Sequence, residues 1–205
     1  MKYLDFKEEF KNFIVFSLAD IRKVENDFDS RRLNEWQVKK YIKKIRRGYY
    51  IFADRSLNEE VLFLIANKIY TPSYVSFEMA FSYYNLIPEG VYSITSATSR
   101  KTNKFRFDQG KFIYHHLKPE LLFGYKLTTY QNHNFKIAEI EKALLDFLYI
   151  NPNLKEENDF VGLRFNSENF IQRADKKKLE DYIAAFQNKS LERRLRKFLK
   201  FINYA

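Results

Sequence analysis

The sequence predicts an α+β protein in three parts, on the basis of three observations. A basic segment over residues 31–50 follows two short amphipathic segments, which is the order of a winged helix-turn-helix within residues 1–55. Further along, the apolar residues change from helical spacing to strand-like runs, which predicts a mixed α/β middle domain with a small sheet over residues 56–150. Asn151-Pro152-Asn153 then marks a break before a helical C-terminal region over residues 151–205.

Composition and charge indicate a folded protein with a polyanionic partner. Hydrophobic residues make up 45% of the 205 residues and aromatic residues 18%, which is enough for a substantial core. The net charge is +10, and residues 1–55 carry fourteen basic and nine acidic residues, whereas residues 56–150 carry ten and nine. The excess of positive charge in the N-terminal part therefore predicts a polyanion bound there.

The sequence also indicates where in the cell the protein is expected. There is no cysteine, which excludes disulfides and thiolate metal sites. No apolar run approaches the roughly 18 residues of a membrane span, and the first residues lack an apolar signal region. We expect a cytoplasmic protein that contacts no membrane and needs no cofactor or metal.

Two helices are predicted before the basic segment. Tyr3, Phe6 and Phe10 have helical spacing and predict a first helix over residues 3–13. Ser17 and Asp20 have the spacing of a capping box, which predicts the start of a second, short helix. The polar residues that follow predict a turn into the third helix.

The third predicted helix is the recognition helix. Asn34 is its expected N-cap and Gln37 occupies the capping-box position. Its apolar stripe has i, i+3, i+4, i+7 spacing and consists of Val38, Tyr41, Ile42 and Ile45. Gly48 can adopt the positive φ of a turn, and the β-prone residues 49–52 after it predict a hairpin wing.

DNA contacts are expected from this segment, in which eight basic residues are opposed by one acidic residue. The residues expected to contact phosphates or bases are Lys39, Lys40, Lys43, Arg46 and Arg47. Arg31 and Arg32 precede the helix and would clamp the backbone beside its amides, and Gln37 is best placed to contact a base. Tyr49 is expected either on the sugar-phosphate or in the core of the wing.

The middle domain is predicted to combine helices and strands. Ser56 and Glu59 predict a capping box for a helix that runs to Tyr70, and Ser76 begins a short helix that ends at Tyr84. The predicted strands cover residues 91–96, 104–107, 111–115 and 127–130. The last predicted helix of this domain covers residues 137–149; its polar side carries Glu139, Lys142 and Asp146, at spacings that allow intrahelical ion pairs.

Two further helices are predicted in the C-terminal region, around residues 177–187 and over residues 191–202. The basic residues of the second helix define a possible second basic surface: Arg193, Arg194, Arg196, Lys197 and Lys200. This surface could contact DNA, RNA or an acidic partner, or be a solvated helix face, and the sequence leaves these alternatives open.

Several separated motifs resemble the AbiEi family of abortive-infection antitoxins and transcriptional regulators. They are the run TPSYVSFEMAFSYYNLIPEGVYSITSAT over residues 71–98, YHHL over residues 114–117, AEIEKALLDFLY over residues 138–149, and the RRGYY of the predicted wing over residues 46–50. The resemblance covers about residues 5–150 and the motifs occur in the family's order.

The resemblance implies a function in a type IV toxin–antitoxin system. Members of the family repress their own operon through the winged helix and counter a nucleotidyltransferase-like toxin without a stable complex with it. The implied DNA-contacting residues are Arg46, Arg47 and Tyr49. The family's antitoxin role lies in the C-terminal region, but no residue beyond position 55 is carried over as an antitoxin site.

Three alternatives remain. A protein-interaction module would bind the toxin or a second copy through the aromatic middle domain, and a regulator that has no toxin partner would bind DNA or RNA alone. A metal-dependent nuclease would use Glu139, Glu141, Asp146 and Lys142, or the turn from Asp108 to Lys111. The three histidines lack a ligand spacing, and no phosphate-binding glycine loop or nucleophile motif is present. We therefore expect no catalytic site.

Overall fold

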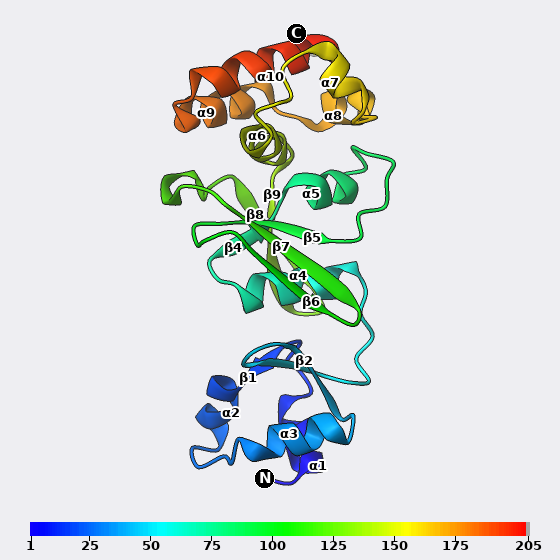
Figure 1. Ribbon diagram of the computed structural model, residues 1–205, viewed down its shortest axis with the longest axis vertical. Coiled ribbons are helices and arrows are strands. Elements are labelled where there is room, and N and C mark those ends of the chain that lie inside the picture. Colours follow the sequence, from blue (N-terminus) through cyan, green and yellow to red (C-terminus); the bar gives the residue numbers. More distant parts are fainter. Residues whose placement is uncertain (204–205) are drawn as a thin grey trace.

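The computed structural model describes residues 1–203 and places them in three layers along one long axis (Figure 1). Within these residues, ten α-helices and two β-sheets confirm an α+β fold. Residues 204 and 205, the end of the expected C-terminal region, lie outside the described residues. No helix in the described part of the chain has the length and apolar character needed to cross a membrane.

The N-terminal layer contains three helices and a three-stranded sheet. Its elements are α1 (Tyr3–Phe10), β1 (Phe16–Ser17), α2 (Leu18–Val24), α3 (Arg31–Val38), β2 (Ile42–Arg46) and β3 (Tyr49–Phe52). The capping box predicted for α2 is confirmed: the Ser17 hydroxyl accepts a hydrogen bond from the amide of Asp20, and the Asp20 carboxylate accepts one from the amide of Ser17. The first helix ends three residues earlier than predicted.

The predicted recognition helix is wrong in its bounds. The helix has Ser30 as its N-cap, so Asn34 lies inside it, and it ends at Val38. Lys40 has a φ of 56°, and the amides of Lys40 and Tyr41 donate to the carbonyls of Gln37 and Trp36. This is the hydrogen-bond pattern of a Schellman motif, in which glycine is the usual residue and lysine is not. The lysine-rich residues after it form strand β2.

The small sheet has both of its faces covered. Its strand order is β1-β3-β2, with Phe16 opposite Tyr50 and Ile42 opposite Phe52. These four side chains pack in an aromatic core with α1 and α3. Ile45 and Ile51 lie on the other face and belong to the core of the middle domain. The N-terminal layer is therefore attached to the rest of the protein through its sheet.

The middle layer is a six-stranded mixed sheet with strand order β6-β7-β5-β4-β9-β8. Its strands are β4 (Ser73–Val75), β5 (Ile94–Thr98), β6 (Asn103–Phe107), β7 (Gly110–His116), β8 (Tyr125–Tyr130) and β9 (His133–Ala138). Helix α4 (Glu59–Ile69) lies on the side of the N-terminal layer, and α5 (Phe77–Tyr83) and α6 (Ile140–Ile150) lie on the other side (Figure 1).

The four predicted strands are present with shifted bounds, whereas β4 and β9 were not predicted. β4 has only three residues, and β9 includes residues 137 and 138, which sequence spacing placed in a helix. The predicted capping box at Ser56 is wrong, because Asn58 caps α4 through its side chain. Ser76 is the N-cap residue of α5, as predicted, but its side chain makes no capping hydrogen bond.

The C-terminal layer contains four helices and shares its core with the middle layer. The helices are α7 (Glu157–Val161), α8 (Ser167–Arg173), α9 (Lys176–Phe186) and α10 (Lys189–Phe201), and a short 3-10 helix, η1 (Pro119–Leu121), precedes β8. The last two confirm the prediction, and α7 and α8 are additional. Phe160, Phe170 and Phe198 are fully buried in the same cluster as the middle sheet.

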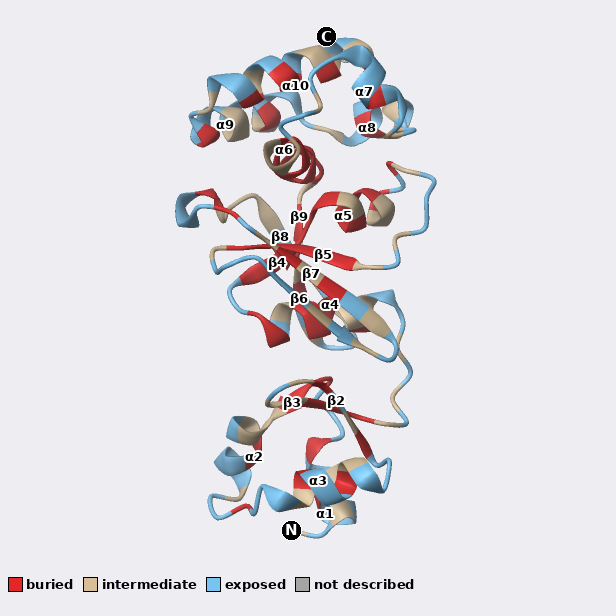
Figure 2. Ribbon diagram, viewed as in Figure 1, coloured by how far each residue is buried: buried red, intermediate tan, exposed pale blue. Residues whose placement is uncertain are grey.

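Helix α6 lies between these layers and is buried on all sides (Figure 2). Sequence spacing placed Lys142 and Asp146 on the polar side of the helix and allowed an ion pair between them, and the pair is present, but both side chains are completely buried. They form an ion pair, Lys142 Nζ donates to the Tyr74 hydroxyl at 2.7 Å, and that hydroxyl donates to Asp146 at 2.8 Å. Both faces of α6 are covered, because α5 packs against it on the side of the sheet and α9 and α10 pack against it on the other side.

Aromatic rings and a serine complete the environment of the pair. Lys142 Nζ lies 5.0–5.4 Å from the ring centres of Tyr74, Phe123 and Phe186. The Ser76 hydroxyl donates to Asp146 at 2.8 Å. Burial lowers the pKa of Lys142 and raises the pKa of Asp146, and the attraction between the two charges opposes both effects.

The other two carboxylates of α6 connect to α9. Glu139 accepts from Lys178 Nζ at 3.1 Å and from the Tyr182 hydroxyl. Glu141 accepts from the amide of Asp175, the N-cap of α9, at 2.7 Å. All the polar groups that suggested a nuclease-like cluster therefore have structural partners.

We predict that Lys142→Met destabilises the fold by about 3–5 kcal/mol, because it leaves the buried Asp146 charge without a partner. The double change Lys142→Met with Asp146→Leu should recover most of this loss, since no buried charge remains. Denaturant unfolding measures both. The matched control is Arg196→Met, which breaks an exposed ion pair with Glu192 at the same i, i+4 spacing and should cost about 0.5 kcal/mol or less. A Lys142→Met loss as small as the control's would contradict this account.

Candidate nucleic-acid interface

The predicted DNA contacts at the start of α3 already have partners within the protein. Arg31 forms an ion pair with Asp29 at 3.0 Å, and its guanidinium lowers the pKa of that carboxyl. Arg32 donates to the carbonyl of Met1 at 2.7 Å. Gln37 donates to the carbonyl of Leu33 at 2.9 Å. The turn before α3 is also acidic, so this end of the helix is a weak site for phosphate.

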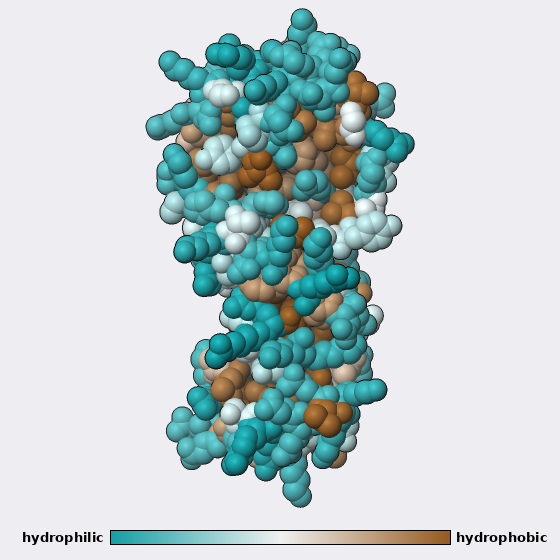
Figure 3. All heavy atoms as spheres, in the orientation of Figure 1, coloured by the Kyte–Doolittle hydropathy of each residue, from teal (hydrophilic) through white to brown (hydrophobic). Residues whose placement is uncertain are grey.

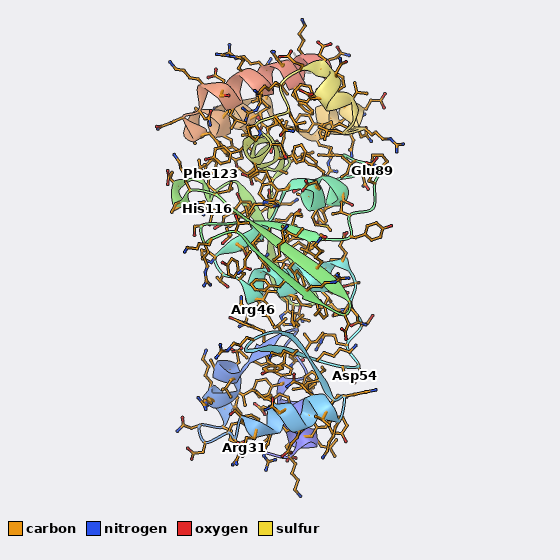
Figure 4. All side chains as sticks on the ribbon, viewed as in Figure 1. Arg31, Arg46, Asp54, Glu89, His116 and Phe123 are labelled. Carbon is orange, nitrogen blue, oxygen red and sulfur yellow. The ribbon has the colours of Figure 1, made fainter. Side chains whose placement is uncertain are left out.

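Arg46 lies between the N-terminal and middle layers (Figure 4). It donates to the carbonyl of Ile69, the last residue of α4, at 2.5 Å. Its guanidinium carbon lies 4.5 Å from the ring centre of Phe105 on β6 and 5.7 Å from that of Tyr70. A guanidinium stacked on aromatic rings and hydrogen-bonded to a carbonyl is well suited to fixing two surfaces against each other. The structure thus places Arg46 in a contact between domains.

Two neighbours of Arg46 also face the middle domain. Lys43 donates to the side-chain carbonyl of Gln109, in the β6–β7 turn, at 3.2 Å. Tyr49 packs at the edge of the middle-domain core, with the Arg46 guanidinium 5.4 Å from its ring centre. Tyr49 is therefore packed within the protein, but against the middle domain and not in the core of the wing.

The remaining basic residues of the segment form what we call the wing-side cluster: Lys39, Lys40, Lys44 and Arg47. All four are exposed, and no salt bridge within residues 1–203 involves any of them. Lys39 and Lys40 follow α3, Lys44 lies on β2 and Arg47 on the β2–β3 turn. Hydrophilic side chains cover most of the N-terminal layer on the face shown in Figure 3. These cations can release counterions when a phosphate backbone binds.

Lys44 was missing from the sequence-predicted contacts. The predicted recognition helix gave no reason to expect different environments for Lys43 and Lys44. In a strand, adjacent side chains point to opposite faces. Lys43 consequently points toward the middle domain and Lys44 is exposed. The period-two spacing of a strand, counted from Ile42, is the sequence signal that could have identified Lys44 as a contact residue.

The predicted second basic surface on α10 is largely neutralised. Arg194 is buried and donates to the carbonyl of Leu148 at 2.9 Å, so its prediction as a surface residue is wrong. Arg196 pairs with Glu192 at 2.5 Å and Lys197 with Glu156 at 2.6 Å. Arg193 and Lys200 are exposed. Two isolated cations are a poor basis for a nucleic-acid surface.

The histidines and carboxylates show no metal-site geometry within residues 1–203, where no group of three potential ligands converges. His115 packs edge-on against the ring of Phe77, and the His116 ring contacts the carbonyl of Arg100 at 3.0 Å. Asp108 lies in the exposed turn between β6 and β7. The carboxylates considered for a nuclease thus do not converge on a metal site within these residues.

We predict that Arg46→Ala loosens the junction between the N-terminal and middle layers, because it removes the hydrogen bond to Ile69 and the contact with Phe105. The expected cost is about 1–3 kcal/mol. Faster hydrogen exchange in β2 and β6, and faster proteolysis of residues 53–58, would report the loosening. Arg47→Ala is the matched control, since Arg47 is exposed on the adjacent turn. Equal protection in the two variants would show that Arg46 does not hold the junction.

No protein-family model matches this chain, and no curated protein matches it. Its function therefore has to be inferred from its own surfaces and contacts.

Proposed function

We propose that this chain is a cytoplasmic DNA-binding regulator that represses its own operon and acts as the antitoxin of a type IV toxin–antitoxin system. The observation that carries the proposal is the position of the wing-side cluster. Four unpaired, exposed cations lie at the end of α3 and along the strand and turn that follow it. In a helix-turn-helix with a wing, these are the elements that meet DNA.

The element order supports a winged helix-turn-helix in residues 1–55. Helices α2 and α3 form the helix pair, and β2 and β3 form the wing. β1 pairs with β3, so the wing hairpin is anchored to the helices as well as to the middle domain. A wing held on both sides presents its turn in a fixed orientation, which lowers the entropic cost of binding.

The exposed stripe of α3 supplies residues that can contact base edges. Asn34 is exposed, and its side chain is not used to cap the helix, since Ser30 is the N-cap. Asn can pair with adenine in the major groove through two hydrogen bonds. Val38 is 83% exposed on the same side of the helix and can contact a thymine methyl group. Asn34 and Val38 are therefore our candidates for sequence discrimination.

The antitoxin part of the proposal is supported by the resemblance of residues 71–98, 114–117 and 138–149 to the AbiEi family. These segments contain β4, α5, β5, the end of β7 and most of α6, and α6 packs against α9 and α10 of the C-terminal layer. In that family the C-terminal region carries the antitoxin role, and here it shares one core with the middle layer. We propose that the two parts work as one unit against a nucleotidyltransferase-like toxin.

We predict that removing the wing-side cluster flattens the salt dependence of DNA binding. Lys39, Lys40, Lys44 and Arg47 are changed together to Gln, and fluorescence anisotropy is measured with the duplex upstream of the gene and a scrambled duplex. Each lost phosphate contact should reduce the slope of log K against log salt by about 0.9. The matched control changes four exposed lysines elsewhere, Lys118, Lys155, Lys177 and Lys189, to Gln and has the same net charge.

Equal slopes for the two quadruple variants would show that the wing-side cluster is not part of the interface.

A separate experiment tests base contacts. Asn34→Ala should reduce the preference for the upstream duplex by a factor equivalent to about 1–3 kcal/mol and leave the salt slope unchanged. Equal binding of both duplexes by the natural chain, dependent on salt alone, would reject an autorepressor.

We predict that co-expression of the chain restores growth to cells that express the nucleotidyltransferase-like product of a neighbouring reading frame, and that the two proteins do not co-purify. A type IV antitoxin opposes the toxin's effect and needs no stable complex. Failure to restore growth would reject the antitoxin role, and a stable complex would favour direct inhibition. Repeating the growth assay with the wing-side quadruple variant separates antitoxin activity from DNA binding.

A further inference from the structure

A cavity of about 570 Å³ opens on the face of the six-stranded sheet that lies away from the N-terminal layer. Helix α5, strands β5 to β7, the connection between α5 and β5, and the segment after α7 surround it. Its volume is in the range of sites that hold drug-sized ligands. Phe81, Phe147 and Ile113 supply apolar walls. None of the residues proposed above for DNA binding lines it.

Glu78 gives this cavity an unusual polar group. It lines the cavity from α5, and its Oε2 atom is fully buried without a hydrogen-bond partner. Buried polar atoms nearly always have a partner, so an exception calls for an explanation. Burial also raises the pKa of Glu78. No cation in the described part of the chain forms a salt bridge with it.

The backbone beside Glu78 is strained. Phe77 has a φ of 61°, a conformation that is an outlier for a bulky residue, and its side chain is completely buried. Its ring packs against the ring of His115, which also lines the cavity. Strain of this kind persists where the surrounding structure enforces it, and it clusters at ligand sites.

A cationic strip begins at the rim of the cavity. Lys104 on β6 lines it, and Arg106, two residues further along the strand, lies on the same face of the sheet. Arg106 is directly opposite Lys111 on β7. Like charges placed opposite each other destabilise a sheet. All three cations are exposed, and no salt bridge within residues 1–203 offsets them.

These groups specify a ligand by its chemistry. Burial disfavours the ionised form of Glu78, but N–H donors from a ligand would favour it. In that form the carboxylate only accepts hydrogen bonds, so it favours a base edge with adjacent N–H donors. Guanine presents two such donors, its ring N1–H and its amino group, whereas adenine and cytosine place an acceptor beside their amino groups. Lysine and arginine bind phosphate oxygens. We propose that the cavity binds a guanine nucleotide unit, with the base at Glu78 and the phosphates along Lys104, Arg106 and Lys111.

The same unit could come from a free nucleotide or from single-stranded nucleic acid, and the test distinguishes them. The full chain is titrated calorimetrically with GTP, ATP, inorganic tripolyphosphate, and two single-stranded RNA oligonucleotides that differ in one terminal guanine or adenine. We expect GTP to bind at least tenfold more tightly than ATP and tripolyphosphate. A tenfold advantage of the guanine oligonucleotide over GTP would assign the site to single strands, and the reverse would assign it to the free nucleotide.

Two variants separate base from phosphate contacts. Glu78→Gln should abolish the guanine preference, and Glu120→Gln, an exposed glutamate on η1, should leave it intact. Arg106→Gln with Lys111→Gln should weaken GTP and ATP alike. Because Glu78→Gln removes an unpaired buried charge, its melting temperature at pH 7 should not fall, which excludes unfolding as the cause.

The proposal is overturned if GTP does not bind, or if GTP, ATP and tripolyphosphate bind equally, which would make the strip a generic polyanion surface. An unchanged guanine preference in Glu78→Gln would also overturn it. These outcomes do not depend on the proposed DNA binding, because the wing-side quadruple variant keeps every residue of the cavity.

Discussion

The buried ion pair between Lys142 and Asp146 is the constraint that the packing at the centre of this protein has to satisfy. Two charges in an apolar interior are costly to desolvate, and the cost is offset only when their hydrogen-bonding capacity is satisfied. Here Tyr74 and Ser76 supply the partners from the start of the middle sheet, and three rings surround the ammonium group. Since one of these rings, Phe186, belongs to α9, the pair fixes the C-terminal helices to the sheet. The same sequence motif that resembles the AbiEi family is therefore a structural junction.

Arg46 likewise joins two layers, the N-terminal and the middle one, and it is less buried than the ion pair. It joins β2 to α4 and β6, so the orientation of the N-terminal layer is set by the middle layer. The basic segment of residues 31–50 consequently divides into two groups. The residues that bind within the protein are Arg31, Arg32, Lys43 and Arg46, and the wing-side cluster remains available to a polyanion. Net charge alone overstates the binding surface, because it counts both groups.

Local signals allowed part of the structure to be predicted. The capping box at Ser17 and the helices of the C-terminal region follow from short-range hydrogen bonding and periodicity, and both are present. The end of α3 could not be predicted the same way, because Lys40 adopts a left-handed conformation that glycine usually marks. The burial of Lys142 depends on β4 and α9, which are remote in sequence. The spacing of Glu139, Lys142 and Asp146 is compatible with a solvated face and with a buried pair, and only tertiary packing distinguishes them.

Strand β6 lies between the Arg46 junction and the cationic strip beside the cavity. Phe105 points toward Arg46 and the N-terminal layer, whereas Lys104 lines the cavity and Arg106 lies on the same face of the strand as Lys104. Successive side chains of a strand point to opposite faces. A shift of β6 would therefore move Phe105 and the two cations together. Two sites are coupled only when a ligand binds one conformational state of the protein more tightly than another. A ligand in the cavity would therefore influence DNA binding only if it preferred one of two positions of this strand. The Arg46 junction is the contact through which such a difference would reach the wing.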